Sequence, residues 1–277
     1  MRKAMISLFT FLILLSGCSV DNMTQHVMKE LELDIKSDPP ENFIPKDLKV
    51  VSIGDSLTQG VGDSTKSGGY IPYLQTQLES LKAIKEAKFT NYGVRGNRTD
   101  QLLKRLNKEK IKESIDEADL VIITIGGNDV MKTFKENISN LKIQAFESAM
   151  VDYEKRLHHI IQKIQSYNPN AGIVLIGIYN PFSTWFSDIK ELNQIIVEWN
   201  TLSSRVIGEY NQTEFVEVQN MFLNSERNLL FEEDYFHPND LGYELMANRM
   251  FKILTQRETL NELTNNQFLL KEEEQPS

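Results

Sequence analysis

The chain has 277 residues, of which 40% are hydrophobic and 25% are charged. Such a composition is ordinary for a soluble globular protein and provides for one substantial core or at most two small ones. A net charge of −9 without any dense Lys/Arg stretch argues against a nucleic-acid partner, because phosphate binding needs clustered positive charge.

The first 18 residues have the three parts of an export signal. Arg2 and Lys3 precede an apolar run from Met5 to Leu15, too short for a comfortable membrane span, and small residues lead to Cys18. The ending Leu-Ser-Gly-Cys resembles the lipobox of bacterial lipoproteins, in which the cysteine is lipidated and becomes the mature N-terminus. We therefore expect a signal peptide over residues 1–17, a lipid such as palmitate on Cys18, and an extracytoplasmic protein anchored to the cell membrane. The alternatives are an uncleaved membrane anchor and an ordinary signal peptide with an incidental cysteine.

Cleavage would leave 28 basic and 39 acidic residues, a net charge of −11. Acylation of the only cysteine would leave no thiol for a disulfide. Residues 18–47 are polar and contain three prolines, so we expect a lipidated N-terminus followed by an extended tether. A single domain is expected over residues 48–262, followed by a polar tail over residues 263–277.

Between tether and tail, short apolar runs alternate with longer helical patterns. The predicted strands are Lys49–Gly54, Phe89–Gly93, Leu120–Ile125, Gly172–Gly177 and Glu214–Val218, and the long predicted helices include Gln144–Ser166 and Ile189–Tyr210. Continuously apolar strands are typical of a parallel sheet that is covered on both faces. We therefore expect a three-layer α/β/α, doubly wound fold with a five-stranded parallel sheet, as in flavodoxin-like proteins. Ligands of such folds bind at the carboxyl ends of the strands.

Four polar motifs lie at or near these strand ends. The first strand runs into Gly-Asp-Ser-Leu, which presents Ser56; alone, this motif is as typical of a strand-to-helix turn with a capping serine as of catalysis. The second runs into NYGVRGNRTD, in which Gly96 allows a sharp turn that exposes backbone N–H groups. The third runs into Gly-Gly-Asn-Asp, which brings the Asn128 amide to the same edge. Asp234 and His237 form an Asp-x-x-His pair before the last helix.

Together these residue types suit ester hydrolysis. A serine hydroxyl needs a base to become a nucleophile, and the imidazole of His237 titrates near neutrality. Asp234 lies three residues earlier and can orient the ring. The N–H groups of Ser56 and Gly96 and the amide of Asn128 can stabilise the tetrahedral intermediate, by about 3 kcal/mol each.

The four motifs, in this order and over residues 49–254, resemble those of the SGNH/GDSL hydrolase superfamily. The resemblance implies a catalytic triad of Ser56, Asp234 and His237 and an oxyanion hole formed by Ser56, Gly96 and Asn128. It implies an esterase, lipase, thioesterase or carbohydrate deacetylase that uses no metal and no organic cofactor. The lipobox and the Tyr-Asn-Pro-Phe stretch at 179–182 are similar to those of surface lipoproteins of Gram-positive bacteria.

The remaining acids and histidines are expected to have no catalytic role. Asp55 and Asp129 flank the proposed donors, and we expect both to hydrogen-bond loop backbone. His158 and His159 lie within a predicted helix without cysteines or suitably spaced carboxylates, so we predict no metal site. His26 lies in the tether.

The sequence thus predicts a membrane-tethered serine hydrolase that cleaves carboxylic, thio- or acetyl esters through an acyl-serine. Its substrate would be a small-molecule, lipid or cell-wall ester. Residues 130–150 are either a lid or wall over the acyl side or a surface helix that packs inward, and Trp185 and Phe186 either line the same mouth or simply pack. The alternatives are acyl transfer to a sugar or wall polymer and a binding lipoprotein without catalysis. The acyl group, the alcohol and the oligomeric state stay open, because substrate choice depends on loops.

Overall fold

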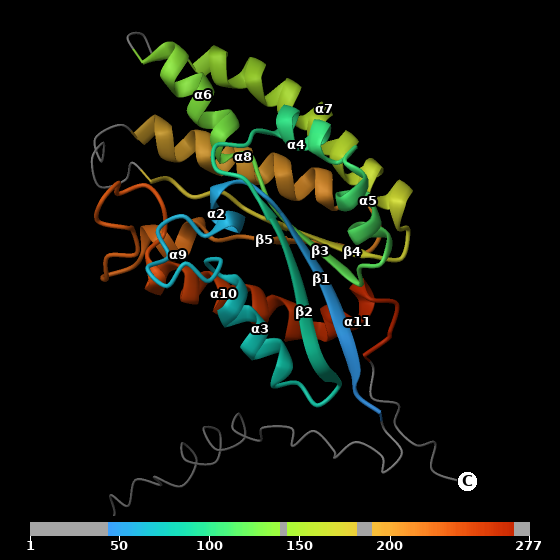
Figure 1. Cartoon of the computed structure of the whole chain (residues 1–277). Coiled ribbons are helices and arrows are strands. Elements are labelled where there is room, and N and C mark those ends of the chain that lie inside the picture. Colours follow the sequence, from blue (N-terminus) through green and yellow to red (C-terminus); the bar gives the residue numbers. More distant parts are fainter. Residues whose placement is uncertain (1–43, 139–142, 182–189, 269–277) are drawn as a thin grey trace, which may run out of the picture. The chain divides into compact units, whose positions relative to one another are not determined.

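The sheet has the predicted parallel architecture. The computed structural model describes residues 44–138, 143–181 and 190–268. Its strands are β1 Lys46–Gly54, β2 Ile84–Gly93, β3 Leu120–Thr124, β4 Gly172–Ile176 and β5 Thr213–Val216. They are ordered β2-β1-β3-β4-β5, and every neighbouring pair is parallel. Helices cover both faces of the sheet (Figure 1), so the doubly wound α/β/α fold is confirmed.

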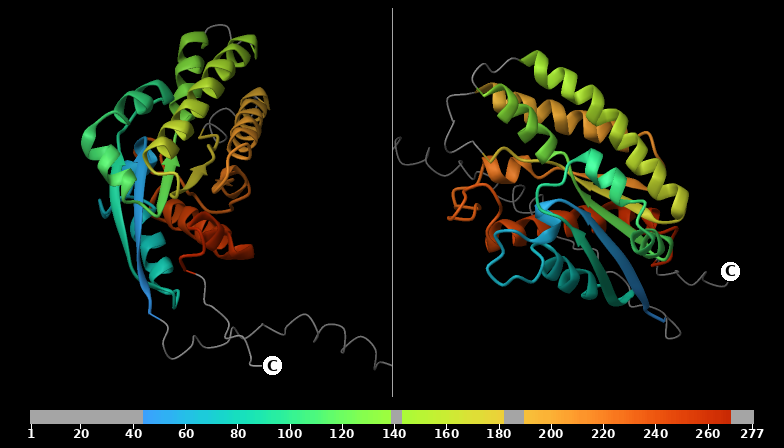
Figure 2. Two further views of the ribbon diagram at one scale, coloured as in Figure 1. Left: turned by 90° about the vertical axis from the view of Figure 1, so that its right-hand side faces the viewer. Right: turned by 45° about the horizontal axis from the view of Figure 1, so that its top comes forward.

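Each face of the sheet has its own helical layer, and Figure 2 shows the sheet between the two. One layer contains α4 Thr99–Arg105, α5 Glu109–Asp116, α6 Gly127–Asn137, α7 Ile143–Tyr167 and α8 Lys190–Ile207. The other contains α3 Ile71–Glu79, α10 Asp240–Thr255, the 3-10 turn η1 Gln256–Glu258 and α11 Thr259–Leu263. The short helices α2 Ser56–Gln59 and α9 Gln219–Leu223 follow β1 and β5.

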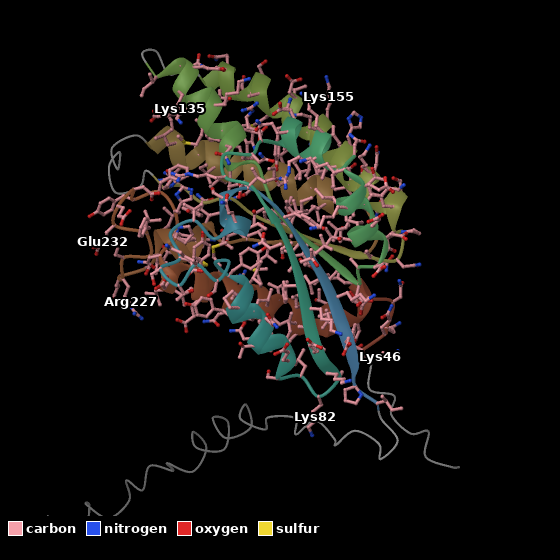
Figure 3. The ribbon with its side chains drawn as sticks, in the orientation of Figure 1. Lys46, Lys82, Lys135, Lys155, Arg227 and Glu232 are labelled. Carbon is pink, nitrogen blue, oxygen red and sulfur yellow. The ribbon has the colours of Figure 1, made fainter. Side chains whose placement is uncertain are left out.

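Two apolar cores hold these layers to the sheet. Along β1, Val51 and Ile53 pack into the core under α7, whereas Leu48 and Val50 pack into the core under α10. This alternation explains why β3 and β4 are apolar at nearly every position, since both of their faces are covered. Charged side chains such as the labelled Lys82, Lys135 and Lys155 lie exposed at the periphery (Figure 3).

Several predicted boundaries are corrected by the structure. Strand β1 begins three residues early and β2 five residues early, because their pairing continues down to Lys46 opposite Ile84. Of residues 84–88 only Ile84 and Ala87 are buried and the other three are exposed, so no apolar run marks this segment. Strands β3 and β4 each end one residue before the predicted limit, and α8 ends at Ile207.

The folded body is also larger than the predicted domain of residues 48–262. Lys46 and Asp47, assigned to the tether, belong to β1. Leu263 and Phe268, assigned to the polar tail, are buried. Leu263 packs closely on the start of β4, since a Cβ atom on Gly172 would lie 2.7 Å from the Leu263 Cβ. None of the described helices is both long and apolar enough to cross a bilayer. The predicted signal peptide, Cys18 and His26 lie outside the described residues.

Candidate active site

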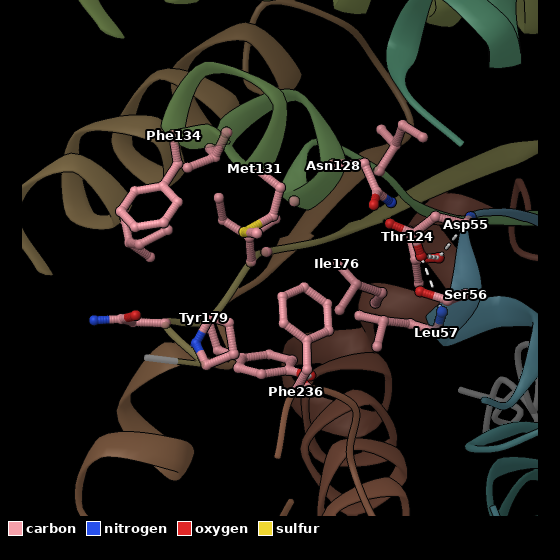
Figure 4. Close-up of a pocket in the computed structure, with 18 of the residues that line it drawn as sticks. Asp55, Ser56, Leu57, Thr124, Asn128, Met131, Phe134, Ile176, Tyr179 and Phe236 are labelled. Atoms are coloured by element: carbon pink, nitrogen blue, oxygen red, sulfur yellow. Dashed lines mark hydrogen bonds between the residues drawn. The ribbon is translucent and has the colours of Figure 1, made fainter. Parts of the chain in front are cut away.

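A cavity lies at the carboxyl ends of β1, β3 and β4 (Figure 4), where doubly wound folds bind their ligands. About 710 Å³ of space without atoms, open solvent at the mouth included, lies between its walls. Its walls come from the start of α2, from α6 and α8, and from the segment that follows β4. Ser56 and Asn128, two of the predicted site residues, both line it.

Ser56 is the first residue of α2 and comes two residues after the end of β1. Strand β1 approaches β3 so closely at Gly54 that a Cβ atom there would lie 2.1 Å from the Thr124 carbonyl oxygen. Only glycine fits such a contact. The tight turn that follows brings Ser56 to the cavity wall, where 4% of its surface is exposed. Its N–H lies in the first turn of a helix, where intrahelical acceptors are missing.

Asp55 has the structural role that the sequence predicts. Its Oδ1 accepts hydrogen bonds from the Leu57 N–H at 3.0 Å and from the Thr124 hydroxyl at 2.9 Å, so it caps α2 and fixes the turn that holds Ser56. Burial raises the pKa of Asp55 to about 7, and the nearby charge of Asp129 adds to this effect, whereas the two hydrogen bonds oppose it.

Asp234 and His237 form the predicted hydrogen-bonded pair. Asp234 Oδ2 lies 2.6 Å from His237 Nδ1, and Oδ1 accepts from the backbone N–H groups of Phe236 and His237 at 2.9 and 3.0 Å. Burial alone would raise the pKa of Asp234, but these hydrogen bonds together lower it, so the group is a carboxylate at neutral pH. Burial lowers the pKa of His237 although Asp234 opposes the shift. The imidazole is therefore neutral near pH 7 and able to accept a proton.

The segment that carries His237 is braced from two sides. A Cβ atom on Gly62, in the loop after α2, would lie 2.3 Å from the Pro238 carbonyl oxygen and 3.3 Å from the His237 Cβ. On the other side, the Tyr179 hydroxyl donates to the Phe236 carbonyl at 2.7 Å. Since Phe236 and Tyr179 both line the cavity, the pair is attached both to the loop that follows Ser56 and to the cavity wall.

Asn128 and Gly96 lie on neighbouring segments at the same rim. Asn128 donates one amide hydrogen to the Asn97 carbonyl at 3.0 Å, which leaves its second amide hydrogen for a ligand. Gly96 has φ +77°, a left-handed conformation that favours glycine, although a Cβ atom there would meet no atom within 4 Å. The Gly96 N–H makes no hydrogen bond with any of the residues that the structure describes.

Arg105 is a positioning residue that the sequence does not reveal. Its guanidinium donates to the Gly54 carbonyl at 3.2 Å, to the Asn97 side-chain oxygen at 2.8 Å and to the Tyr92 carbonyl at 2.5 Å. It therefore joins the ends of β1 and β2 to the loop that contains Gly96. An arginine near the end of a short amphipathic helix is typical of a solvated surface position, so no local pattern indicates these contacts.

Asp129 also has its predicted structural role. Its carboxylate accepts from the Thr99 N–H at 3.0 Å and from the Thr99 hydroxyl at 2.6 Å, and Arg156 lies 3.3 Å away. These contacts hold the start of α6 to the start of α4. The Asn128 amide is thereby set beside the loop that contains Gly96.

The proposed nucleophile and base are not hydrogen-bonded to each other. Neither the Ser56 hydroxyl nor Nε2 of His237 makes a hydrogen bond with any of the residues placed by the structure. In ligand-free enzymes the hydrogen bond between nucleophile and base is frequently long and tightens only when substrate binds. The structure thus brings Ser56 and Asn128 to one cavity and pairs Asp234 with His237 next to it.

The structure describes residues 130–138 and 143–150 of the segment that the sequence suggests as a lid or wall. Helix α6 packs inward with Val130 and Phe134 buried, and both side chains line the cavity, so this part of the segment is a wall. Residues 139–142, Trp185 and Phe186 lie outside the described residues.

His158 lies 2.7 Å from the Tyr210 hydroxyl. Over residues 44–138, 143–181 and 190–268, no three His, Cys, Asp or Glu side chains cluster as a metal site.

The shifted pKa of Asp55 makes stability depend on pH. The folded chain keeps a proton on Asp55 up to about pH 7, whereas the unfolded chain loses it near pH 4. The free energy of unfolding therefore falls as pH rises from 4 to 8, on the order of 3 kcal/mol from this group. Asp55→Asn cannot titrate, so urea unfolding should show the variant gaining stability relative to wild type over this range. The control is Asp116→Asn, at an exposed position on α5. It should not gain stability relative to wild type over this pH range. Parallel curves for wild type and Asp55→Asn would contradict the assignment.

Comparison with known proteins shows which family the chain is similar to. The model of the GDSL-like Lipase/Acylhydrolase family matches residues 52–245. An uncharacterized protein of Bacillus subtilis, YpmR, is 36% identical over 206 residues, which cover 74% of this chain and 80% of that protein. The spore germination lipase LipC of Bacillus licheniformis is 25% identical over 207 residues, which cover 73% of this chain and 94% of LipC.

Two solved structures share the fold. The lipase Lip_vut3 from a goat rumen metagenome superposes with a TM-score of 0.68 at 24% identity, covering 76% of this chain and 99% of that one. A catalytic serine-to-alanine mutant of Axe2, an acetylxylan esterase of Geobacillus stearothermophilus, superposes with a TM-score of 0.58 at 19% identity, covering 77% of this chain and 96% of that one. Because the family model matches most of the chain, the chain belongs to the GDSL-like lipase/acylhydrolase family of esterases and lipases.

Proposed function

We propose that this chain hydrolyses carboxylic esters through a covalent acyl-serine on Ser56. One observation carries the proposal: Ser56 and Asn128 line one cavity, and the hydrogen-bonded Asp234–His237 pair adjoins it through Phe236. A nucleophile, an anion-stabilising amide and an acid–base pair at one rim are the parts that acyl transfer to serine requires.

Each residue has a defined part in the reaction. His237 Nε2 takes the proton of the Ser56 hydroxyl while Oγ bonds to the ester carbonyl carbon. The oxyanion that forms accepts hydrogen bonds from the N–H groups of Ser56 and Gly96 and from the Asn128 amide. The imidazolium, stabilised by Asp234, then gives its proton to the leaving alcohol. Water then attacks the acyl-serine and gives a proton to His237. The bond between Oγ and the acyl carbon breaks, the imidazolium returns its proton to Oγ, and the carboxylic acid leaves.

We further propose that the chain acts outside the cytoplasm, held to the membrane by a lipid on Cys18. The support is the sequence pattern of residues 1–18, with its basic start, apolar run and Leu-Ser-Gly-Cys ending. The polar residues that follow would let the folded body work at a distance from the bilayer.

Loss of the Ser56 hydroxyl should abolish catalysis. Ser56→Ala should lower kcat for p-nitrophenyl butyrate by at least about 10⁴-fold, and a fluorophosphonate probe should label wild type but not the variant. Ser166→Ala, at an exposed position on α7, is the matched control and should keep full activity and labelling. A wild-type chain that neither turns over esters nor reacts with the probe would be a binding protein, and retained activity in Ser56→Ala would exclude this nucleophile.

The pH dependence should report the environment of His237. Because burial lowers its pKa, the acid limb of kcat/KM should have its midpoint below the ordinary value of about 6.5. Asp234→Asn removes the group that holds the pKa up, so the midpoint should move further down while kcat falls by roughly 10⁴-fold. If the midpoint does not move in Asp234→Asn, Asp234 does not interact with the His237 imidazole in the working enzyme.

The anchor can be tested by labelling cells that produce the full chain. We expect the wild type to incorporate labelled palmitate and to sediment with membranes, and Cys18→Ser to lose the label. An unlabelled wild type that stays in the membrane would indicate an uncleaved anchor, and an unlabelled wild type released to the medium would indicate an ordinary signal peptide.

A further inference from the structure

We infer that the acyl group of the substrate is an apolar chain of several carbons, held between α6 and α8, and not an acetyl group. The inference rests on the proposed function and adds the class of acyl group to it. Both acetyl esterases and lipases occur among proteins with this fold, so the fold alone does not decide between them. The side chains that line this chain's own cavity distinguish the two classes of acyl group.

The cavity has one polar end. Asp55, Ser56, Thr124 and Asn128 contribute its polar groups at the strand ends. Asp55 and Thr124 are hydrogen-bonded to each other, so they are not available to a ligand. The reacting ester is therefore placed by Ser56 and Asn128.

Apart from the Tyr179 hydroxyl and the Asn180 amide, the other side chains that line the cavity are apolar. Helix α6 contributes Val130, Met131 and Phe134, and α8 contributes Leu192 and Ile196. In Figure 4 the side chains of Met131 and Phe236 lie between Ser56 on one side and Phe134 on the other. The cavity thus leads from the ester-binding end along an apolar wall toward Phe134.

These walls favour methylene groups over water or sugar hydroxyls. The segment after β4 contributes one amide to the lining, that of Asn180. Its side-chain nitrogen already donates a hydrogen bond to Asn193 Oδ1 at 2.7 Å. An acetyl group would leave the apolar wall exposed to water, whereas each additional methylene buried there should raise kcat/KM by roughly four- to tenfold. The wall therefore selects for chain length until the chain reaches Phe134.

Phe236 connects this wall to the acid–base pair. Its side chain lines the cavity, its N–H donates to Asp234 and its ring packs edge-on against the His237 imidazole, with 5.0 Å between ring centroids. A chain that fills the cavity contacts the side chain next to the base. Chain length should therefore affect kcat as well as KM.

The test is a panel of p-nitrophenyl esters from acetyl to decanoyl, with each rate divided by its uncatalysed rate. We expect kcat/KM for the hexanoyl ester to exceed that for the acetyl ester by at least about a hundredfold. Met131→Trp fills the cavity from α6 and should lower this ratio at least tenfold. Lys132→Trp places the same side chain on the exposed side of α6 and should leave the ratio unchanged.

A second variant keeps the inference testable if Met131→Trp does not fold. Phe134→Leu shortens the far wall, so the ester with the highest kcat/KM should become longer by one or more methylenes. A wild type that labels with fluorophosphonate but prefers acetyl, or shows a flat profile, overturns this inference and leaves the proposed function standing. A wild type that neither labels nor hydrolyses any ester overturns both.

Discussion

The site depends on how closely β1 and β3 approach each other at Gly54. Because Gly54 has no side chain, the Thr124 hydroxyl reaches Asp55, Asp55 caps α2, and Ser56 faces the cavity. Arg105 then binds the Gly54 carbonyl and the loop that contains Gly96. Ser56 and Asn128 are therefore placed by strand ends and helix starts, and Gly96 lies in a loop that Arg105 attaches to β1. Such support is what keeps a catalytic geometry in place when substrate binds.

Two carboxylates near the site have pKa values shifted in opposite directions. Asp55 is buried and lies near a second acid, so its pKa rises to about 7. Asp234 accepts three hydrogen bonds, one of them from the imidazole, so its pKa falls. Environments that separate the pKa values of two acids separate their roles. Asp234 is the carboxylate that can stabilise a protonated His237, whereas Asp55 contributes to structure.

The sequence predicted those features that follow from local rules. Continuous apolar runs predicted the parallel sheet. The positions of Ser56 and Asn128 after strands predicted that both lie at one edge, and the spacing of three residues predicted the contact between Asp234 and His237. The first half of β2 was missed because its exposed edge carries no apolar run. Leu263 and Phe268 were missed because they lie in a largely polar stretch and are buried only by tertiary packing. The contacts of Arg105 and the apolar wall along α6 and α8 each involve residues that are far apart in the sequence. No local pattern indicates which of these residues contact one another.

The acid and the base lie on one short segment that is braced by Gly62 and by the Tyr179 hydroxyl. A local opening of residues 231–238 would withdraw both groups in a single event, with their mutual hydrogen bond intact. The serine, the Asn128 amide and most of the apolar wall belong to other elements and would remain in place. In that opened state the molecule would keep the residues that hold an ester and lack the acid and base that break it.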